Sequence, residues 1–342
     1  MINKNNLSLP AEISSGFRAL RLRVDLLSTE KVLWPADPDG YMHQGVGGWL
    51  HMQGCPNVMT HGAPCADECT WRILNRPSVA PELYEFKKPP AALALSVLLP
   101  GSTHLAAGEG FAVEVVLVGP GVDKYQTVLG AIEDFGINKA SFIITSVSCL
   151  TPRGYEVIYE KHLLSHAEPY IFTWEILERM SLLFAEDELC LRFLTPATTG
   201  SGQKMIGLTF KVFIEECVAR IRALLLVYFL SIPPGDALKK FKSWRKEVLD
   251  AASFITTTPP ATVQWINRSY HRNDRVVPTG GIVGLFRYYG EMRSFLPLAL
   301  AGELLNIGKH TALGNGVFRI CRPEQAEWLA QNNLAETLNE YM

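Results

Sequence analysis

The sequence lacks three features that would place it in a special class of protein. Residues 1–6 contain no apolar run, so no signal peptide is expected. The most apolar stretch, residues 206–232, is interrupted by five charged side chains and does not predict a membrane span. Neither sign of charge dominates, since the net charge is −2, and this excludes a uniformly basic nucleic-acid binder.

What is present is the composition of an ordinary folded protein. Hydrophobic residues make up 48% of the chain and charged residues 19%. A length of 342 residues exceeds the size at which one core keeps growing, so two domains are predicted, 1–185 and 186–342. Seven cysteines without a secretion signal favour reduced thiols and a cytoplasmic location, with no membrane association.

Positive charge is concentrated in one part of the chain. Residues 239–322 hold 13 Lys or Arg against 5 Asp or Glu, which predicts a basic face that could meet nucleic acid. The lysine-rich segment 239–242 is equally compatible with a solvated helix. Within the basic region, cationic and aromatic side chains alternate in a way that suits unstacked bases and phosphates. These residues are Trp265, Arg268, Tyr270, His271 and Arg272.

Hydrophobic periodicity predicts strands and helices that alternate in each half of the chain. The predicted strands are 17–26, 111–118, 141–149, 188–195, 280–290 and 317–320. The predicted helices are 45–52, 122–135, 236–252 and 295–305, together with a long helix inside 206–232. Residues from about 53 to 100 are rich in proline and are predicted to be irregular. This order fits an α+β protein of two ferredoxin-like domains, although periodicity alone does not select that fold.

The most informative segment is residues 302–317, which combines an apolar helix end, a loop with three glycines and the start of a strand. Glycines can let backbone N–H groups approach a ligand, and Lys309 adds a positive charge, so the loop could hold an anion such as an RNA backbone. The order helix–loop–strand excludes a dinucleotide fingerprint. The alternative interpretation is a tight turn.

Three segments in this order resemble the C-terminal domain of the CRISPR-associated pre-crRNA-processing endoribonucleases of the RAMP superfamily. They are the strand 191–196 ending in Thr-Pro, the glycine-led strand 280–290, and the glycine loop with its Gly-Lys and Gly-x-Gly pairs. Residues 41–51 match more loosely the glycine-containing helix start of the N-terminal domain. Gln44 stands where the family usually has an arginine, which puts local RNA contacts in doubt.

The resemblance implies tandem ferredoxin-like (RAMP/RRM-like) domains that bind CRISPR repeat RNA. It also implies metal-independent cleavage of precursor crRNA within the repeat, by attack of a 2′-OH that leaves a 2′,3′-cyclic phosphate. The rival expectation is a non-catalytic RAMP protein that holds guide RNA in an effector complex. Partners would be repeat RNA and other CRISPR effector proteins, with the chain a monomer or a homodimer.

Candidate site residues follow from the resemblance and from the chemistry of RNA cleavage. His51 is the first candidate for acid–base catalysis, then His43 and Tyr41, because imidazole titrates near neutrality; either histidine could instead bond a loop carbonyl, and Tyr41 could serve packing. The predicted RNA-binding residues are Gly308, Lys309, His310, Gly314, Gly316, Arg268, His271, Arg272 and Arg287.

A cysteine-bearing insertion at about 53–100 offers a metal hypothesis. Cys55, His61, Cys65 and Cys69 are predicted to hold a structural zinc, since Cys65-x3-Cys69 has usual ligand spacing. Reduced thiols in a loop are the alternative, and a metal-stapled protein-interaction module is a third functional hypothesis. No cofactor is expected for catalysis.

Overall fold

The computed structural model describes residues 7–35, 37–55, 65, 69–79, 83, 89–98, 104–136, 140–161, 167–184, 187–198, 208–229, 232–258, 262–272 and 275–321. These residues divide into two compact units. The N-terminal unit is Arg18–Phe172 with Ala312–Gly314, and the C-terminal unit lies within Met1–Phe17, Thr173–Thr311 and Asn315–Met342. The expected boundary at 185/186 therefore lies beyond the observed division at Phe172.

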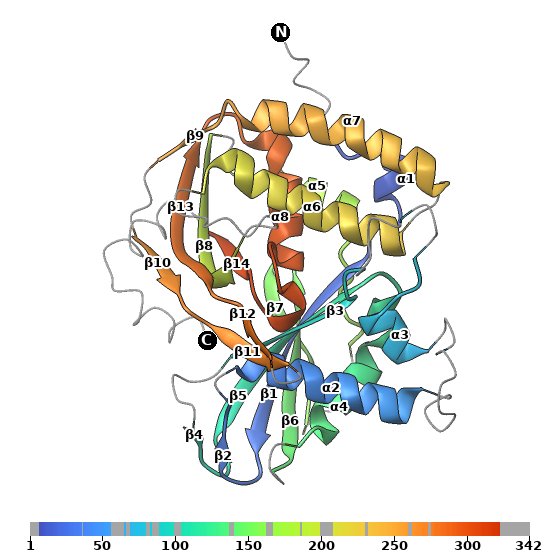
Figure 1. The fold of residues 1–342 in the computed structure, drawn as a ribbon, viewed down its shortest axis with the longest axis vertical. Helices are drawn as coiled ribbons and strands as arrows, with labels where there is room; N and C mark the ends of the chain where they lie inside the picture. Colours follow the sequence, from blue (N-terminus) through green and yellow to red (C-terminus); the bar gives the residue numbers. More distant parts are fainter. Residues whose placement is uncertain are drawn as a thin grey trace. The chain divides into compact units, whose positions relative to one another are not determined.

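The N-terminal unit is built on a five-stranded antiparallel sheet in the order β3-β5-β1-β6-β7 (Figure 1). Its strands are β1 (Ala19–Ser28), β3 (Leu93–Leu98), β5 (Gly110–Val118), β6 (Phe142–Thr151) and β7 (Gly154–Glu160). Its helices are α2 (Pro38–Gly54), α3 (Thr70–Asn75) and α4 (Tyr125–Asp134), with the 3₁₀ turn η2 (Gly119–Lys124) before α4. The short strands β2 (Val32–Leu33) and β4 (His104–Leu105) pair with each other. The chain order β1-α2-β3-β5-α4-β6 is the ferredoxin-like arrangement.

The C-terminal unit repeats this topology. Its sheet runs β10-β13-β8-β14, and α6 and α8 occupy the two crossover positions. The strands are β8 (Glu188–Ala197), β9 (Thr256–Thr257), β10 (Thr262–Ile266), β13 (Gly281–Tyr289) and β14 (Phe318–Cys321). The helices are α1 (Ala11–Ser14), α5 (Trp174–Ser181), α6 (Phe210–Tyr228), α7 (Pro234–Ala252) and α8 (Leu296–Leu305), preceded by η3 (Arg293–Phe295). Both units thus confirm the predicted α+β, ferredoxin-like fold class.

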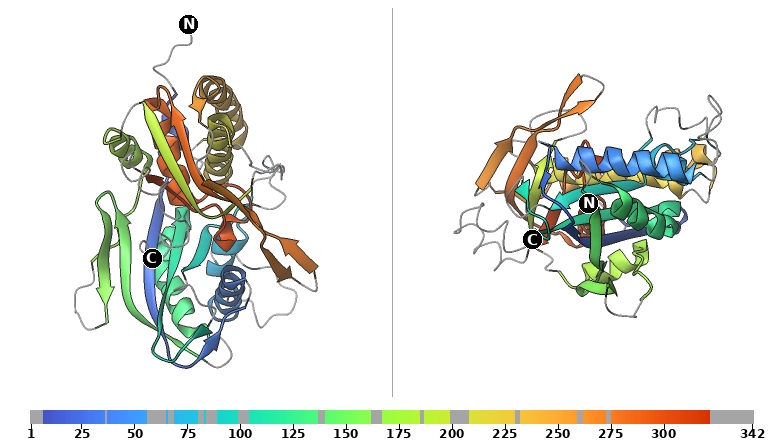
Figure 2. Two further views of the ribbon diagram at one scale, coloured as in Figure 1. Left: turned by 90° about the vertical axis from the view of Figure 1, so that its left-hand side faces the viewer. Right: turned by 90° about the horizontal axis from the view of Figure 1, so that it is seen from below.

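A hairpin of β11 (Ser269–Arg272) and β12 (Arg275–Pro278) extends from the C-terminal unit beyond its own sheet (Figure 2). Residues 7–17, near the start of the chain, also belong to this unit. The Trp244 indole on α7 donates to the Leu7 carbonyl at 2.9 Å, and Lys240 pairs with Glu12 at 2.6 Å. These contacts explain why residues 7–17 join the C-terminal unit.

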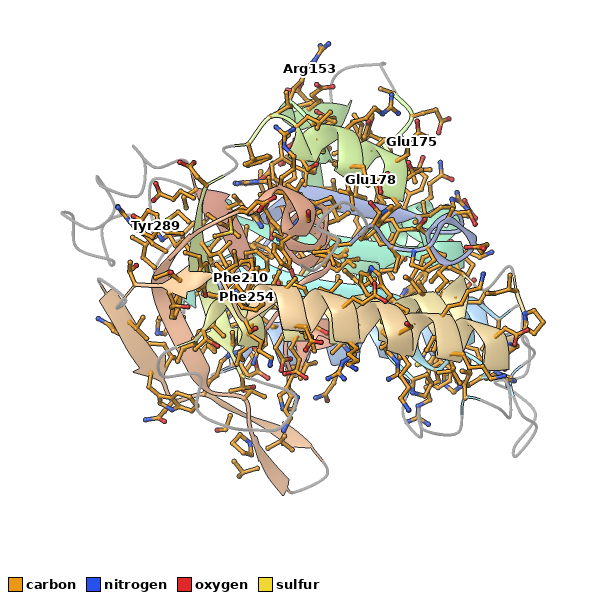
Figure 3. The ribbon with its side chains drawn as sticks, turned by 90° about the horizontal axis from the view of Figure 1, so that it is seen from above. Arg153, Glu175, Glu178, Phe210, Phe254 and Tyr289 are labelled. Atoms are coloured by element: carbon orange, nitrogen blue, oxygen red, sulfur yellow. The ribbon has the colours of Figure 1, made fainter. Side chains whose placement is uncertain are left out.

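The core of the C-terminal unit is aromatic. Phe193 and Phe286 on the sheet meet edge to face, and Phe213 on α6 stacks on Tyr288 of β13. The Tyr288 hydroxyl, fully buried, donates to the Leu208 carbonyl at 3.1 Å. Phe254, which follows α7, and Tyr289, at the end of β13, lie outside this core (Figure 3).

Several predicted elements differ from the observed ones. The helix expected at 45–52 is longer, because Pro38 starts it at a position that proline favours and the glycines inside it do not end it. The proline-rich region contains β3, an edge strand of the sheet, and α3. Strand β1 was expected to be half-buried, but Arg21 is fully buried there because its guanidinium pairs with Glu114 of β5.

The expectation that residues 206–232 do not cross a membrane is consistent with the helices. Within the described part of the chain, no helix combines the length and the apolar character that a bilayer requires.

Candidate functional site

Helix α2 carries all three candidate catalytic residues, but it directs them differently. Tyr41 is 40% exposed, and its ring lies 5.7 Å from that of Phe135. His43, two residues further on, lies toward the buried side with Met42, Val46 and Leu50. His51 follows His43 by eight residues, or about 12 Å along a helix axis. The two histidines therefore cannot serve as acid and base at one phosphate.

His43 lies in an apolar setting. The residue is partly exposed, yet its Nε2 atom is buried and has no hydrogen-bond partner among the described residues. Burial lowers the pKa of His43 to about 4, because the imidazolium ion loses its hydration. His43 is therefore neutral at pH 7, which suits a proton acceptor better than a phosphate-binding cation.

His51 lies in a different environment, near the end of α2. Its ring centroid is 4.7 Å from that of Trp71 on α3, and the two rings are tilted by 52°. The Arg76 guanidinium sits 5.5 Å from the same Trp71 ring, in a cation–π contact. Trp71 therefore packs against the candidate histidine.

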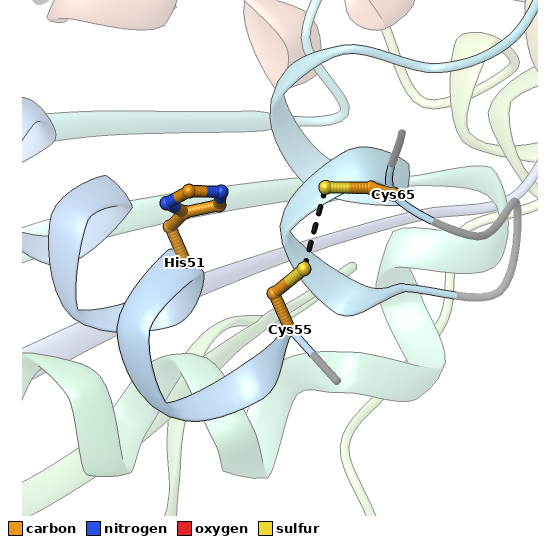
Figure 4. Close-up of side chains that lie close together, drawn as sticks. All are labelled: His51, Cys55 and Cys65. Atoms are coloured by element: carbon orange, nitrogen blue, oxygen red, sulfur yellow. Dashed lines mark hydrogen bonds between the residues drawn. The ribbon is translucent and has the colours of Figure 1, made fainter. Parts of the chain in front are cut away.

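Two cysteines complete this neighbourhood (Figure 4). One ligand atom each of His51, Cys55 and Cys65 lies within 4.8 Å of the others. The Cys55 and Cys65 sulfurs are 3.3 Å apart and share a hydrogen bond. That bond, with burial and the neighbouring Cys55 and Cys69 thiols, raises the pKa of Cys65 to about 11. The structure thus brings two of the four predicted zinc ligands, Cys55 and Cys65, together with His51, while His61 lies outside the described residues.

The two ends of the glycine loop between α8 and β14 are held by the C-terminal unit. The Lys309 N–H donates to the Thr198 carbonyl at 3.1 Å, and the Gly316 N–H to the Pro196 carbonyl at 3.0 Å. The Val317 N–H donates to Thr195 Oγ1 at 2.9 Å. The expectation that loop N–H groups serve as an anion cradle is therefore wrong for these groups, because protein oxygens already accept their hydrogen bonds.

The glycines themselves are required by close backbone approaches. A Cβ atom on Gly308 would lie 2.3 Å from the Thr198 carbonyl oxygen, and one on Gly316 would lie 1.7 Å from the Ile307 carbonyl oxygen. Gly314, within the N-terminal unit, would place a Cβ 2.6 Å from Ser96 Oγ. All three have positive φ angles. The glycines are thus explained by the turn, which was the alternative interpretation.

The basic candidates are spread over the C-terminal unit. Lys309 and His310 are partly exposed in the loop, and Arg287 is partly exposed on β13. Arg268 is partly exposed just before β11, whereas His271 and Arg272 are described only as part of that strand. Trp265 on β10 is 38% exposed, with its indole N–H donating to Asn267 at 3.0 Å. These RNA-binding candidates therefore lie on the inner strand β13, at the hairpin and in the glycine loop.

Comparisons with known families agree with this organisation. Residues 191–318 match the model of the CRISPR-associated endoribonuclease Cas6. A second family model, described only as an N-terminal domain, matches residues 17–170 and so coincides with the N-terminal unit. A search of curated proteins found no match.

Two solved structures with TM-scores above 0.5 support the fold, and a third is reported beside them. A Cas6 product complex aligns over 89% of this chain and 100% of its own, with 15% identity and a TM-score of 0.51. A partial Cas6-RT-Cas1–Cas2 complex aligns over 89% of this chain and 46% of its own, with 11% identity and a TM-score of 0.51. Cas6 from Thermus thermophilus aligns over 89% and 99%, with 13% identity and a TM-score of 0.49.

Two ferredoxin-like units and the glycine loop between α8 and β14 agree with these matches. Residues 191–318, which are 128 of the 342 residues, are similar to the Cas6 endoribonuclease family. Both units share their fold with a Cas6 protein of known structure.

Proposed function

We propose that this protein binds CRISPR repeat RNA and cleaves precursor crRNA within the repeat. The match of residues 191–318 to the Cas6 endoribonuclease family carries this proposal. The tandem ferredoxin-like fold supports it, since the Cas6 product complex has the same fold. In this proposal the protein acts in the cytoplasm as a monomer or homodimer, and other CRISPR proteins are its partners.

The proposed chemistry is transesterification without a metal ion in the reaction. A base removes the proton from the 2′-OH, the oxygen attacks the adjacent phosphorus, and the 5′ oxygen of the next nucleotide leaves with a proton from an acid. The products are a 2′,3′-cyclic phosphate and a 5′-OH. The residues required are one proton acceptor, one proton donor and a cation near the phosphate.

Helix α2 supplies the candidates for acid and base, which are Tyr41, His43 and His51. Tyr41 and His43 both lie near the start of α2 but on different sides of the helix, whereas His51 lies beside two cysteines at the other end. The lowered pKa of His43 keeps its imidazole in the basic form at pH 7. Since the phosphate of a bound RNA would favour the imidazolium ion, we expect the pKa to rise on binding.

The C-terminal unit supplies the cations that would position RNA. Lys309, Arg268 and Arg287 are the described candidates, and phosphate contacts of this kind orient the RNA without reading its sequence. His271 and Arg272 on the β11–β12 hairpin extend this set. His310, whose backbone has φ +60, adds an imidazole to the glycine loop.

The test is cleavage of repeat RNA transcribed from the CRISPR array of the source genome, in EDTA and without added Mg²⁺. A single cut with a 2′,3′-cyclic phosphate supports the proposal, and a repeat with a 2′-deoxy nucleotide at the cut should resist. The variants Tyr41→Phe and His43→Ala should each slow cleavage at least 100-fold while RNA binding persists.

Two outcomes would overturn the proposal. Tight binding of the repeat with no cut under any condition would identify a protein that only holds guide RNA. Cleavage that requires Mg²⁺ and leaves a 5′-phosphate would show a metal-dependent nuclease instead.

A further inference from the structure

The end of α2 and the segment before α3 bring three potential metal ligands together, and a fourth cysteine follows next to α3. His51 and Cys55 are spaced by four residues, so they share one face of α2 and its C-terminal cap. Cys65 faces them from the other side, and Cys69 immediately precedes α3. The chain pattern is therefore His-x3-Cys followed, nine residues later, by Cys-x3-Cys. Both spacings are usual for zinc ligands.

The distances fit a single tetrahedral ion. Two thiolates bound to zinc at about 2.3 Å lie roughly 3.8 Å from each other. The Cys55 and Cys65 sulfurs are 3.3 Å apart, and the His51 nitrogen completes a group in which all ligand atoms are within 4.8 Å. Cys69 lies outside this group of three but is the residue that directly precedes α3, four positions after Cys65, and its thiol contributes to the raised pKa of Cys65.

The surroundings favour a closed, structural site. Cys55 and Cys69 are almost fully buried. The Arg72 guanidinium donates to the Cys65 carbonyl and, at 2.5 Å, to Ser78 Oγ, which fixes the backbone that presents the thiol. Trp71 covers one side of the His51 ring. Four protein ligands leave no open position for a substrate.

We propose that His51, Cys55, Cys65 and Cys69 bind one zinc ion that joins the end of α2 to the start of α3. Thiolates and imidazole together select zinc over magnesium and calcium, which prefer oxygen ligands. The ion would link Cys55 to Cys65, which nine residues separate in the sequence. His51 replaces His61 in the ligand set expected from the sequence. As a zinc ligand, His51 is a structural residue and takes no part in proton transfer.

The first experiment measures zinc in the full-length protein, purified under reducing conditions, by elemental analysis and by competition with a chromogenic chelator. We expect one zinc per chain. His51→Ala, Cys55→Ser, Cys65→Ser and Cys69→Ser should each weaken zinc binding more than tenfold. The matched controls Cys321→Ser, His104→Ala and His61→Ala should stay within twofold of the wild-type chain.

The second experiment avoids the risk that a ligand variant fails to fold. The wild-type protein is produced in cobalt-supplemented medium, and its absorption spectrum is recorded. Intense visible bands of tetrahedral Co²⁺ with sulfur-to-metal charge transfer support a site with three thiolates and one imidazole. A weak octahedral spectrum would overturn the proposal.

Three further outcomes would also overturn it. They are a wild-type chain that neither retains nor takes up zinc, a Cys55–Cys65 disulfide in the protein purified from cells, and zinc lost in His61→Ala but kept in His51→Ala. This test does not depend on the proposed function, because zinc content is read without RNA. Conversely, a His43→Ala protein that no longer cleaves RNA but still contains zinc would show that the zinc site and the cleavage activity can be tested separately.

Discussion

Replacement of Gly316 by alanine tests whether the glycine loop is shaped by the fold or by a ligand. Gly316 has φ +74, and a Cβ there would lie 1.7 Å from the Ile307 carbonyl oxygen. The two residues are also joined by the bond from the Ile307 N–H to the Gly316 carbonyl at 3.1 Å. Alanine must therefore move one side of the loop away from the other.

Three effects lower the free energy of unfolding of Gly316→Ala. A left-handed conformation costs a non-glycine residue about 1–2 kcal/mol. Loss of the Ile307–Gly316 hydrogen bond costs about 1 kcal/mol, and the backbone shift adds strain. A total of about 2–4 kcal/mol, at roughly 2–4 °C per kcal/mol for a unit of this size, predicts a drop in melting temperature of about 5–15 °C.

The assay is thermal unfolding of Gly316→Ala beside Gly130→Ala, with binding of repeat RNA measured on each protein below its transition. Gly130 lies in α4 with nothing within 4 Å of an added Cβ, so its alanine variant should be as stable as the parent or slightly more so. If Gly316→Ala unfolds at the parental temperature and yet loses RNA binding, the glycine serves the ligand and the structural argument is refuted.

Three other predictions test the site and the sheet that supports it. Glu114→Gln should lower the free energy of unfolding by about 3–5 kcal/mol, because the buried Arg21 loses its carboxylate partner. Tyr155→Phe, which removes the 2.8 Å hydrogen bond to Glu114, should lower it by about 1–3 kcal/mol. Equal melting temperatures of the two variants would contradict this ranking. Because the pKa of His43 is about 4 when folded and 6.5 when unfolded, stability should be complete above pH 6.5 and fall by about 3 kcal/mol as the pH drops to 4. His43→Leu should flatten this dependence in melting curves recorded across that range, and an unchanged slope would show that His43 does not cause it. Lys309→Ala should weaken RNA binding without changing stability and lower the slope of log affinity against log salt by about 1; an unchanged slope would exclude a phosphate contact.

Many helices and strands of this fold can be predicted from local sequence patterns. Strand β5, helix α7 and helix α8 follow from clear periodicity, and each was predicted within a few residues. Strand β3 was missed because prolines surround its short apolar run and hide the pattern. It becomes a strand because β5 offers an edge whose backbone groups need partners. Local signals therefore identified the long elements, and pairing with a distant strand decided the short one.

The candidate site also has features that the sequence predicts and features that only the folded structure reveals. Sequence spacing alone identified the cysteines, the basic region and the glycine loop as the places to examine. It could not identify the zinc histidine, since the His51–Cys55 pair becomes visible only when α2 is known to continue to Gly54. It also could not show that the loop glycines face protein backbone, because Thr198 and Ile307 reach them only in the folded unit.

The sequence by itself determined the α+β class and the resemblance to RNA-processing proteins of the CRISPR system, because these depend on periodicity and on motifs within short segments. The ferredoxin-like halves followed from that resemblance and not from periodicity. The tertiary structure alone decided which side chains meet. Arg21 pairs with Glu114 in the interior, and His51 lies beside Cys55 and Cys65, because contacts between residues distant in sequence depend on how strands pair and helices pack.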